Sequence, residues 1–407
     1  MPIITLVSGI FCDKQSVLDK LVAESNYTVI NDDAVVEQVA TISGMEARKI
    51  RRAYSVKTSV FNKFTHEKEC SIAHMRLAVA DIMAEDDLII DGLSGYLIPQ
   101  TIDHVLRVCL VADMQFRVAN AIESGVASER EARRRIGEAD GDLAGWVNTL
   151  FSKQDPWDEE LYDIVIPMSS MNADQAQDII SQNLSKEVLR KSNISNTAQR
   201  NFLLASHTEA ILCKAGHDVS VEADNGAIRI HINKHVLMLG RLEEELKRIA
   251  EEIPGVKWVE TQVGKDFHKA NIYRKHNFEA PSRVLLVDDE REFVQTLSER
   301  LQLRDVGSAI VYDGNSALEI IKEDDPEVII IDLKMPGVNG IDVLKQVKRQ
   351  RPEIEVIVLT GHGSESDKQE CLNLGAFDYL QKPVDIDHLS DVLKKAHENI
   401  RKKSEQG

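Results

Sequence analysis

The last third of the chain contains five short apolar runs, and a helical pattern follows each of them. The runs cover residues 284–287, 309–311, 328–331, 356–359 and 377–380. Strands that alternate with helices predict a parallel sheet covered by helices on both faces. Five such units predict a flavodoxin-like (βα)5 sheet, in which ligands bind beyond the carboxyl ends of the strands.

Polar side chains stand at those carboxyl ends. Asp288 and Asp289 follow the first run, Asp332 follows the third, Thr360 ends the fourth and Lys382 follows the fifth. Three carboxylates on one edge repel one another and need a cation, and hard oxygen ligands of this kind suit Mg²⁺. The lysine suits a phosphoryl oxygen and the threonine hydroxyl could complete the cradle. One carboxylate must then accept the phosphoryl group, because the cluster holds no better nucleophile.

The stretches "VLLVDDE", "VIIIDLKMPGVNGIDVL", "VIVLTGHGS" and "GAFDYLQKPVD" closely resemble the response-regulator receiver domain. The resemblance implies that Asp332 takes a phosphoryl group from a histidine kinase. It also implies that Asp288, Asp289, Asp332 and the backbone carbonyl of Lys334 hold Mg²⁺. An Asp-Asp pair alone is typical of a helix cap, but all the elements together at the correct strand ends favour the receiver.

The same resemblance assigns roles to the remaining residues of the edge. Lys382 would form an ion pair with the phosphoryl group, and Pro383 would follow a cis peptide bond. Thr360 and Tyr379 would be the switch pair that reports phosphorylation to the last helices. We therefore expect a two-component response regulator whose Asp332 switches the contacts of the other domains.

The N-terminal part also alternates strands and helices, with apolar runs at residues 3–7, 27–30, 88–90, 106–111 and 162–166. This pattern predicts a second doubly wound parallel sheet. The loop after the first run has Gly9 and Ser16 at the separation of a phosphate-binding loop, G-x-x-x-x-G-K-[ST]. However, Lys14 stands where the second glycine belongs and Gln15 stands where the lysine belongs. A capping box, residues 128–131, predicts the start of a long helix.

This part resembles the cytidylate-kinase-like branch of P-loop kinases, through "PIITLVSG", "VINDDAVVEQVA", "DLIIDGLSGYLI" and "VASEREARRRIGEAD". The family's third-strand arginine is missing, and Arg133, Arg134 and Arg135 are interpreted as a solvated helix face. Because each loss removes positive charge from a triphosphate site, we expect a pseudokinase with little or no activity. The alternative is a nucleoside monophosphate kinase gated by the receiver, so enzymatic activity beyond receiver phosphorylation and dephosphorylation stays open.

The sequence pattern in the middle of the chain predicts a small α+β module. Asp224-Asn225-Gly226 between alternating apolar residues indicates a hairpin, and an amphipathic helix and a strand at residues 256–263 follow. The module loosely resembles the BON interaction module, and its histidines, His207, His217, His231 and His235, form no convincing metal site. We therefore expect three domains, residues 1–185, 196–267 and 282–402, with a polar stretch after residue 184 and another linker at 268–282.

The composition limits which binding partners and which cellular compartment we expect for this protein. The net charge of −18 and pI near 5.2 argue against a protein that binds DNA mainly through phosphates. The sequence has no apolar run long enough for a bilayer and no signal-peptide pattern, and its five scattered cysteines indicate neither a zinc site nor a disulfide framework. We expect a cytoplasmic protein with a histidine kinase as phosphodonor and an unidentified protein as output partner. The receiver could also mediate a dimer.

Overall fold

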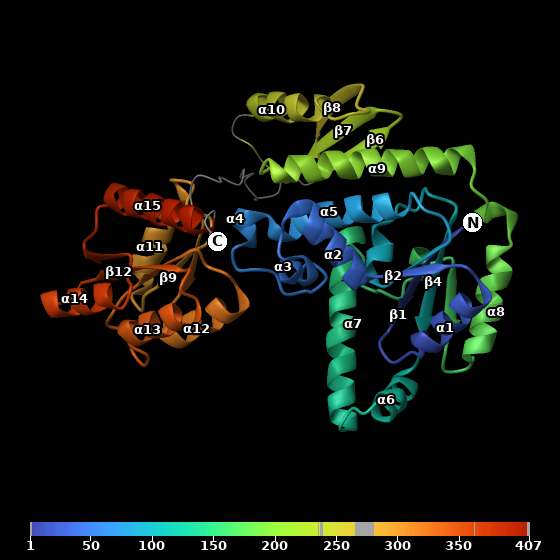
Figure 1. Cartoon of the computed structure of the whole chain (residues 1–407), viewed down its shortest axis with the longest axis horizontal. Helices are drawn as coiled ribbons and strands as arrows, with labels where there is room; N and C mark the ends of the chain where they lie inside the picture. Colours follow the sequence, from blue (N-terminus) through green and yellow to red (C-terminus); the bar gives the residue numbers. More distant parts are fainter. Residues whose placement is uncertain (1, 235, 237–238, 265–280, 362, 405–407) are drawn as a thin grey trace. The chain divides into compact units, whose positions relative to one another are not determined.

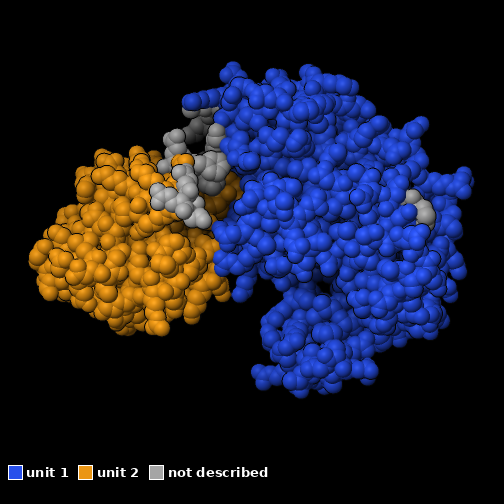
Figure 2. All heavy atoms as spheres, in the orientation of Figure 1, with its two compact units in different colours: residues 1–58, 67–273 blue, residues 59–66, 274–407 orange. Residues whose placement is uncertain are grey.

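The chain folds into two compact units, coloured separately in Figure 2. The computed structural model describes residues 2–234, 236, 239–264, 281–361 and 363–404. Unit 1 consists of residues 1–58 and 67–273, and unit 2 consists of residues 59–66 and 274–407. The first two domains expected from the sequence fall together in unit 1, so their separation stays a prediction.

Unit 1 is built on a five-stranded, fully parallel sheet in the order β2-β3-β1-β4-β5 (Figure 1). The strands are β1 (Ile3–Ser8), β2 (Thr28–Asn31), β3 (Leu88–Asp91), β4 (Val105–Val111) and β5 (Ile164–Pro167). Successive side chains of a strand point to opposite faces. Ile4 and Leu6 accordingly belong to one hydrophobic cluster and Ile3 and Val7 to another. The doubly wound parallel sheet predicted for this part is therefore confirmed.

Helices cover both faces of this sheet. The cluster that contains Leu6 is completed by α1 (Lys14–Glu24) and α8 (Ala173–Leu184). The opposite cluster is completed by α2 (Asp32–Ser43), α3 (Ala47–Arg52), α5 (Glu67–Ile82) and α7 (Glu129–Phe151). The predicted cap of the long helix is present, since the Ser128 side chain accepts a hydrogen bond from the Glu131 N–H at 3.2 Å. A shorter helix, α6 (Met114–Glu123), follows β4.

The middle module forms a three-stranded sheet in the order β6-β7-β8. Its elements are α9 (Asn193–Lys214), β6 (Ser220–Asp224), β7 (Ala227–Ile232), α10 (Leu239–Glu251) and β8 (Trp258–Val263). The predicted hairpin is present, and φ is +50° at Asn225 and +95° at Gly226, which suits a tight two-residue turn. The polar stretch after residue 184 runs directly into α9. His235 and residues 265–280 of the predicted linker lie outside the described residues.

A disulfide joins Cys70 on α5 to Cys213 on α9. The scattered cysteines of the sequence predicted no disulfide framework, and that prediction is wrong at this pair. The two cysteines are 143 residues apart in the chain, and packing of α5 against α9 brings their Cα atoms to 5.5 Å. Spacing along the chain carries no signal for such a pair, because the helix packing alone brings the cysteines together.

Unit 2 contains a parallel sheet in the order β10-β9-β11-β12-β13, the order of flavodoxin-like folds. Its strands are β9 (Val284–Val287), β10 (Ser308–Val311), β11 (Val328–Ile331), β12 (Glu355–Thr360) and β13 (Asp378–Gln381). One face packs against α11 (Arg291–Gln302) and α15 (Ile386–Ser404). The other packs against α12 (Gly314–Glu323), α13 (Gly340–Gln350) and α14 (Glu365–Asn373). The predicted (βα)5 fold is therefore confirmed.

One segment of unit 2 comes from far upstream in the chain. Ser59–His66, which includes the one-turn helix α4 (Asn62–Thr65), lies between α3 and α5 in sequence but belongs to unit 2. Among the residues that the structure describes, none of the helices combines the length and apolar character that a bilayer crossing requires.

Candidate functional site

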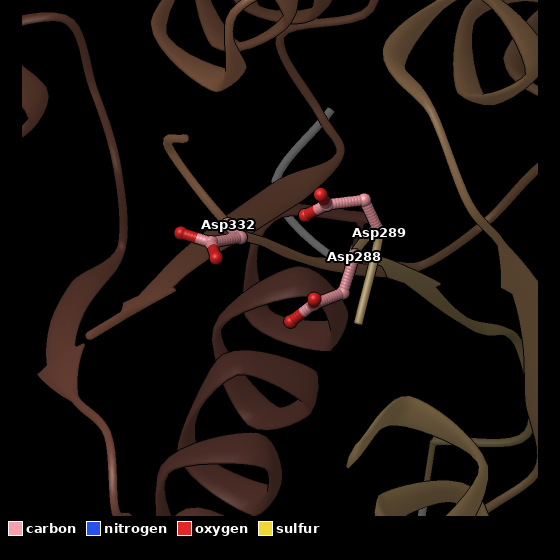
Figure 3. Close-up of side chains that lie close together, drawn as sticks. All are labelled: Asp288, Asp289 and Asp332. Carbon is pink, nitrogen blue, oxygen red and sulfur yellow. The ribbon is translucent and has the colours of Figure 1, made fainter. Parts of the chain in front are cut away.

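Three carboxylates meet at the carboxyl edge of the unit 2 sheet (Figure 3). Asp288 and Asp289 follow β9 directly, and Asp332 follows β11, its neighbour in the sheet. One carboxylate oxygen from each lies within 4.8 Å of the others. Asp288 and Asp332 are buried, whereas Asp289 is more exposed. The structure therefore brings together the three aspartates that the sequence analysis selected.

Lys382, which follows β13, provides the positive charge at this edge. Its Nζ lies 2.7 Å from Oδ2 of Asp288, 2.8 Å from Oε1 of Glu290 and 3.2 Å from Oδ2 of Asp332. The ammonium also lies over the ring of Phe293, 4.3 Å from its centroid. Glu290 was not among the predicted site residues, although its place directly after the Asp-Asp pair puts it on the same edge.

The charges of the site act on one another. Burial lowers the pKa of Lys382, but hydrogen bonds to Asp288 and Glu290 outweigh burial and raise that pKa above its ordinary value. Burial also raises the pKa of Asp288, against the opposing effect of the hydrogen bond from Lys382. The single ammonium of Lys382 faces three carboxylates, and Asp289 adds a fourth nearby. The site therefore carries an excess of negative charge. Oxygen ligands with this excess charge fit a hard divalent cation such as Mg²⁺.

The backbone around Asp332 holds its carboxylate in place. The Asp332 N–H donates to the carbonyl of Val287 at 3.0 Å, and the Lys334 N–H donates to Oδ1 of Asp332 at 3.3 Å. Behind the aspartate, a Cβ on Gly340 would lie 2.1 Å from the carbonyl oxygen of Asp332. Only glycine allows this approach, so the last glycine of "MPGVNG" has a role in positioning. The predicted metal contact of the Lys334 carbonyl stays a prediction.

Thr360 and Tyr379 lie close together beside the site. Thr360 ends β12 and is buried, and Tyr379 lies on the adjacent strand β13. A Cβ on Gly363 would meet both the Tyr379 hydroxyl, at 1.5 Å, and Cγ2 of Thr360, at 3.1 Å. Within the described part of the chain, the buried Tyr379 hydroxyl has no hydrogen-bond partner. The peptide bond between Lys382 and Pro383 is cis, as predicted.

In the altered phosphate-binding loop of unit 1, the side chains at the motif positions form contacts with other residues of unit 1. Lys14 begins α1, and its Nζ lies 2.5 Å from Oδ1 of Asp91 at the end of β3. The Gln15 side chain donates to Asp19 on the same helix. The Ser16 hydroxyl donates to Asp13, whose side chain lies at the helix N-terminus where a phosphate would bind. The loop therefore presents a carboxylate, rather than a free lysine, to an incoming anion.

A buried arginine that the sequence analysis missed lies under this loop. Arg117 on α6 donates two hydrogen bonds to Asp140 on α7, at 2.8 and 2.7 Å, and one to the carbonyl of Ile10 at 2.9 Å. A Cβ on Gly9 would lie 3.0 Å from its guanidinium group. The positive charge of Arg117 is thus already paired with a carboxylate. The sequence around Arg117 gave no signal of these contacts, because the partners of Arg117 lie in two other parts of the chain.

The three consecutive arginines of α7 lie on its exposed face, as expected. Arg133 pairs with Glu129, Arg134 pairs with Glu131 and Glu138, and Arg135 pairs with Glu131. Each arginine side chain is more than half exposed. These ion pairs along one helix are typical of a solvated surface.

Two family models match separate parts of the chain. Residues 284–394 match the family model of the response regulator receiver domain. Residues 3–170 match that of the cytidylate kinase-like family. The receiver match includes all the carboxylates of the site, Thr360, Tyr379 and Lys382.

Curated relatives resemble the receiver region. The transcriptional regulatory protein CpxR of Escherichia coli (strain K12) is 38% identical over 120 residues, which are 28% of this chain and 51% of CpxR. The C4-dicarboxylate transport transcriptional regulatory protein DctD of Pseudomonas aeruginosa is 34% identical over 121 residues, 30% of this chain and 26% of DctD. The chain thus spans about half the length of CpxR and about a quarter of DctD.

Solved structures give similar matches. A response regulator receiver domain protein from Clostridium thermocellum is 32% identical, with a TM-score of 0.28, and the match covers 29% of this chain and 95% of that one. The signal receiver domain of a Luxo repressor protein from Vibrio parahaemolyticus is 29% identical, with a TM-score of 0.30, and the match covers 31% and 95%.

Proposed function

Because residues 284–394 are a receiver domain homologous to those of two-component response regulators, we propose that this protein is itself a phosphorylated response regulator. Asp332 is the proposed phosphoryl acceptor, and a histidine kinase is the proposed donor. The observation that carries the proposal is the meeting of Asp288, Asp289, Asp332 and Lys382 at one sheet edge.

In the proposed reaction, a carboxylate oxygen of Asp332 attacks the phosphorus of a phosphohistidine. The new O–P bond forms as the N–P bond breaks, and the imidazole leaves and takes up a proton. Lys382 lies 3.2 Å from the Asp332 carboxylate, close enough to stabilise negative charge on the transferring phosphoryl oxygens. The backbone contact at Gly340 holds the nucleophile in position for this attack.

Asp288, Asp289 and Asp332 are the proposed ligands of Mg²⁺, with the Lys334 carbonyl as a further ligand. Bound Mg²⁺ would neutralise carboxylate and phosphoryl charge at this edge. After transfer, the phosphoryl group would place about two negative charges next to Lys382 and Thr360, where the Asp332 carboxylate carried one. The Tyr379 hydroxyl, buried beside Thr360, is the proposed group that carries the change to α14 and α15.

For unit 1, we propose a kinase-like fold that does not transfer phosphate. Lys14 is paired with Asp91, and Arg117 is paired with Asp140, so both cations near the loop are already neutralised. Asp13 at the start of α1 would repel a triphosphate. The alternative, a kinase gated by the receiver, has the family match over residues 3–170 in its favour. The BON-like role of the middle module remains a proposal based on resemblance.

Incubation of the full-length protein with acetyl phosphate and Mg²⁺ tests the proposal. Intact-mass measurement should show one added phosphoryl group that is labile in both acid and base. Asp332→Asn should not be labelled, whereas Glu319→Gln, an exposed carboxylate on α12, should be labelled as the parent is. Equal labelling of Asp332→Asn and the parent would show that another residue accepts the phosphoryl group.

A further inference from the structure

Residues 59–66, "SVFNKFTH", have a position that the phosphoryl-transfer proposal does not explain. In sequence they connect α3 and α5 of unit 1, yet they fold as part of unit 2 and are coloured with it in Figure 2. They also lie outside residues 284–394, which match the receiver family. The receiver of this chain therefore includes a segment that the family match does not contain.

Phe61 is the centre of this segment. Its side chain is fully buried, with a relative exposure of 0%. It belongs to the same hydrophobic cluster as Leu285 and Val287 of β9 and Ala317 and Ile321 of α12. Phe61 is thus a core residue of the receiver, although it lies far upstream of the receiver in the chain.

Two further contacts fix the segment on the receiver. A Cβ on Gly307, just before β10, would lie 2.7 Å from Cγ and 2.8 Å from Cβ of Phe64, so Phe64 packs directly on this backbone. The Val60 N–H donates to Oδ2 of Asp324 at 3.3 Å. Asp324 caps the C-terminal end of α12 and is buried. The polar bond at Val60 and the two buried rings that follow it, Phe61 and Phe64, give the segment one defined register.

The segment is also shaped by bonds within itself. The Phe61 N–H donates to the Ser59 hydroxyl at 3.1 Å, and the Asn62 N–H donates to the Ser59 carbonyl at 3.0 Å. The Phe64 N–H then donates to the Phe61 carbonyl at 2.8 Å. These local bonds hold both phenylalanines on one short turn, which lowers the entropy lost when they dock.

The docked segment lies at the end of the sheet away from the carboxylates. Gly307 and Asp324 precede β10 and β11, whereas Asp288 and Asp332 follow β9 and β11. A four-residue strand spans about 13 Å, so the two sets are separated by the length of the strands. Contact at this end, the base of the receiver, leaves the phosphorylation edge free.

We propose that residues 59–66 are a docking arm, which anchors the receiver by its base to the kinase-like part of the same chain. Because the arm enters and leaves unit 1 at residues 58 and 67, the receiver is tied to unit 1 through the arm as well as through residues 265–280. The anchor holds in both phosphorylation states, since its contacts lie away from Asp332. The inference does not depend on phosphoryl transfer.

Cleavage of the second connection tests the arm. A site for a sequence-specific protease is inserted between residues 264 and 281 of the full chain, and the cut protein is passed over a size-exclusion column at about 1 μM. The two fragments should elute together in the parent. They should also co-elute in Val60→Ala, whose exposed side chain is shortened while its N–H is kept. Phe61→Ala should separate them, because loss of a buried ring weakens association by about a hundredfold or more.

Two results would overturn the proposal. One is separation of the parent fragments after cleavage, and the other is co-elution of the Phe61→Ala fragments at the parental position. Hydrogen exchange of the β9 and β11 amides in the released fragment shows whether its receiver is still folded. If Phe61→Ala abolishes their protection, Phe64→Ala, which removes the ring that packs on Gly307, decides the question by the same column. Co-elution of Phe64→Ala like the parent would then reject the arm.

Discussion

Replacing Asp289 by asparagine should stabilise unit 2 in the absence of a divalent cation. The carboxylate of Asp289 lies within 4.8 Å of those of Asp288 and Asp332. At 4.8 Å, two like charges repel by about 0.9 kcal/mol in water and by about 3.5 kcal/mol at an effective dielectric constant of about 20. The nearby ammonium of Lys382 attracts Asp289 and offsets roughly one of the two repulsions. The remaining repulsion predicts a net gain of between about 0.9 and about 3.5 kcal/mol for the charge-neutral variant, nearer the lower figure because Asp289 is the most exposed of the three.

Hydrogen exchange is the suitable assay, because Trp146, Trp157 and Trp258 all lie in unit 1 and their fluorescence does not report on unit 2. In a chelator such as EDTA, amides of β9 and β11 should exchange about tenfold more slowly in Asp289→Asn than in the parent. Added Mg²⁺ should protect the parent, since a ligand that binds only the folded state stabilises it. It should protect the variant much less, because a charged ligand is gone.

Either of two results would contradict this prediction. Exchange of Asp289→Asn in chelator could match or exceed the parental rate, which would mean that the carboxylates do not strain the metal-free site. Alternatively, Mg²⁺ could protect variant and parent equally, which would remove Asp289 from the metal site. Glu319→Gln, which removes a solvated charge from α12, is the control and should exchange at the parental rate with and without Mg²⁺.

Three other predictions use different parts of the molecule. Gly340→Ala should destabilise unit 2 by about 1–3 kcal/mol and slow labelling of Asp332 by acetyl phosphate, because the new Cβ would lie 2.1 Å from the Asp332 carbonyl; parental labelling and exchange rates would contradict it. Burial raises the pKa of Glu355, but contacts with Lys403 and Lys348 prevail and lower it. Its contribution to stability is thus present above pH about 4.5 and lost as the pH falls through the lowered folded-state value, so Glu355→Gln should flatten this acid-side loss in exchange-detected unfolding. The parent protein should show no ATP binding in calorimetry at millimolar nucleotide and no turnover with ATP and CMP, and turnover at an ordinary enzyme rate would favour the gated kinase instead.

The carboxylate edge could be predicted because a parallel sheet converts position in the sequence into position in space. Every strand of such a sheet ends on the same edge, so Asp288, Asp332 and Lys382 had to converge once the strands were recognised. Glu290 follows the same logic and could have been found by reading one residue further.

Contacts between distant elements could not be predicted in this way. Arg117 gave no signal of its pairing with Asp140, since the two lie on different helices and each has the appearance of a surface residue. Cys70 and Cys213 are joined by helix packing and follow no spacing rule. Phe61 was similarly hidden, because it stands in a short polar stretch that has neither helical nor strand periodicity.

The origin of Phe61 has a consequence for the inheritance of this receiver. Recombination moves domains between genes as uninterrupted coding segments. A crossover between the codons for residues 264 and 281 would transfer the receiver without Phe61 and leave a cavity in its core. A foreign receiver joined to unit 1 by the same crossover would meet an arm whose side chains fit a different surface. We therefore expect the codons for residues 59–66 and those for the receiver to have been exchanged together and to have diverged in step at the arm and at the base of the receiver.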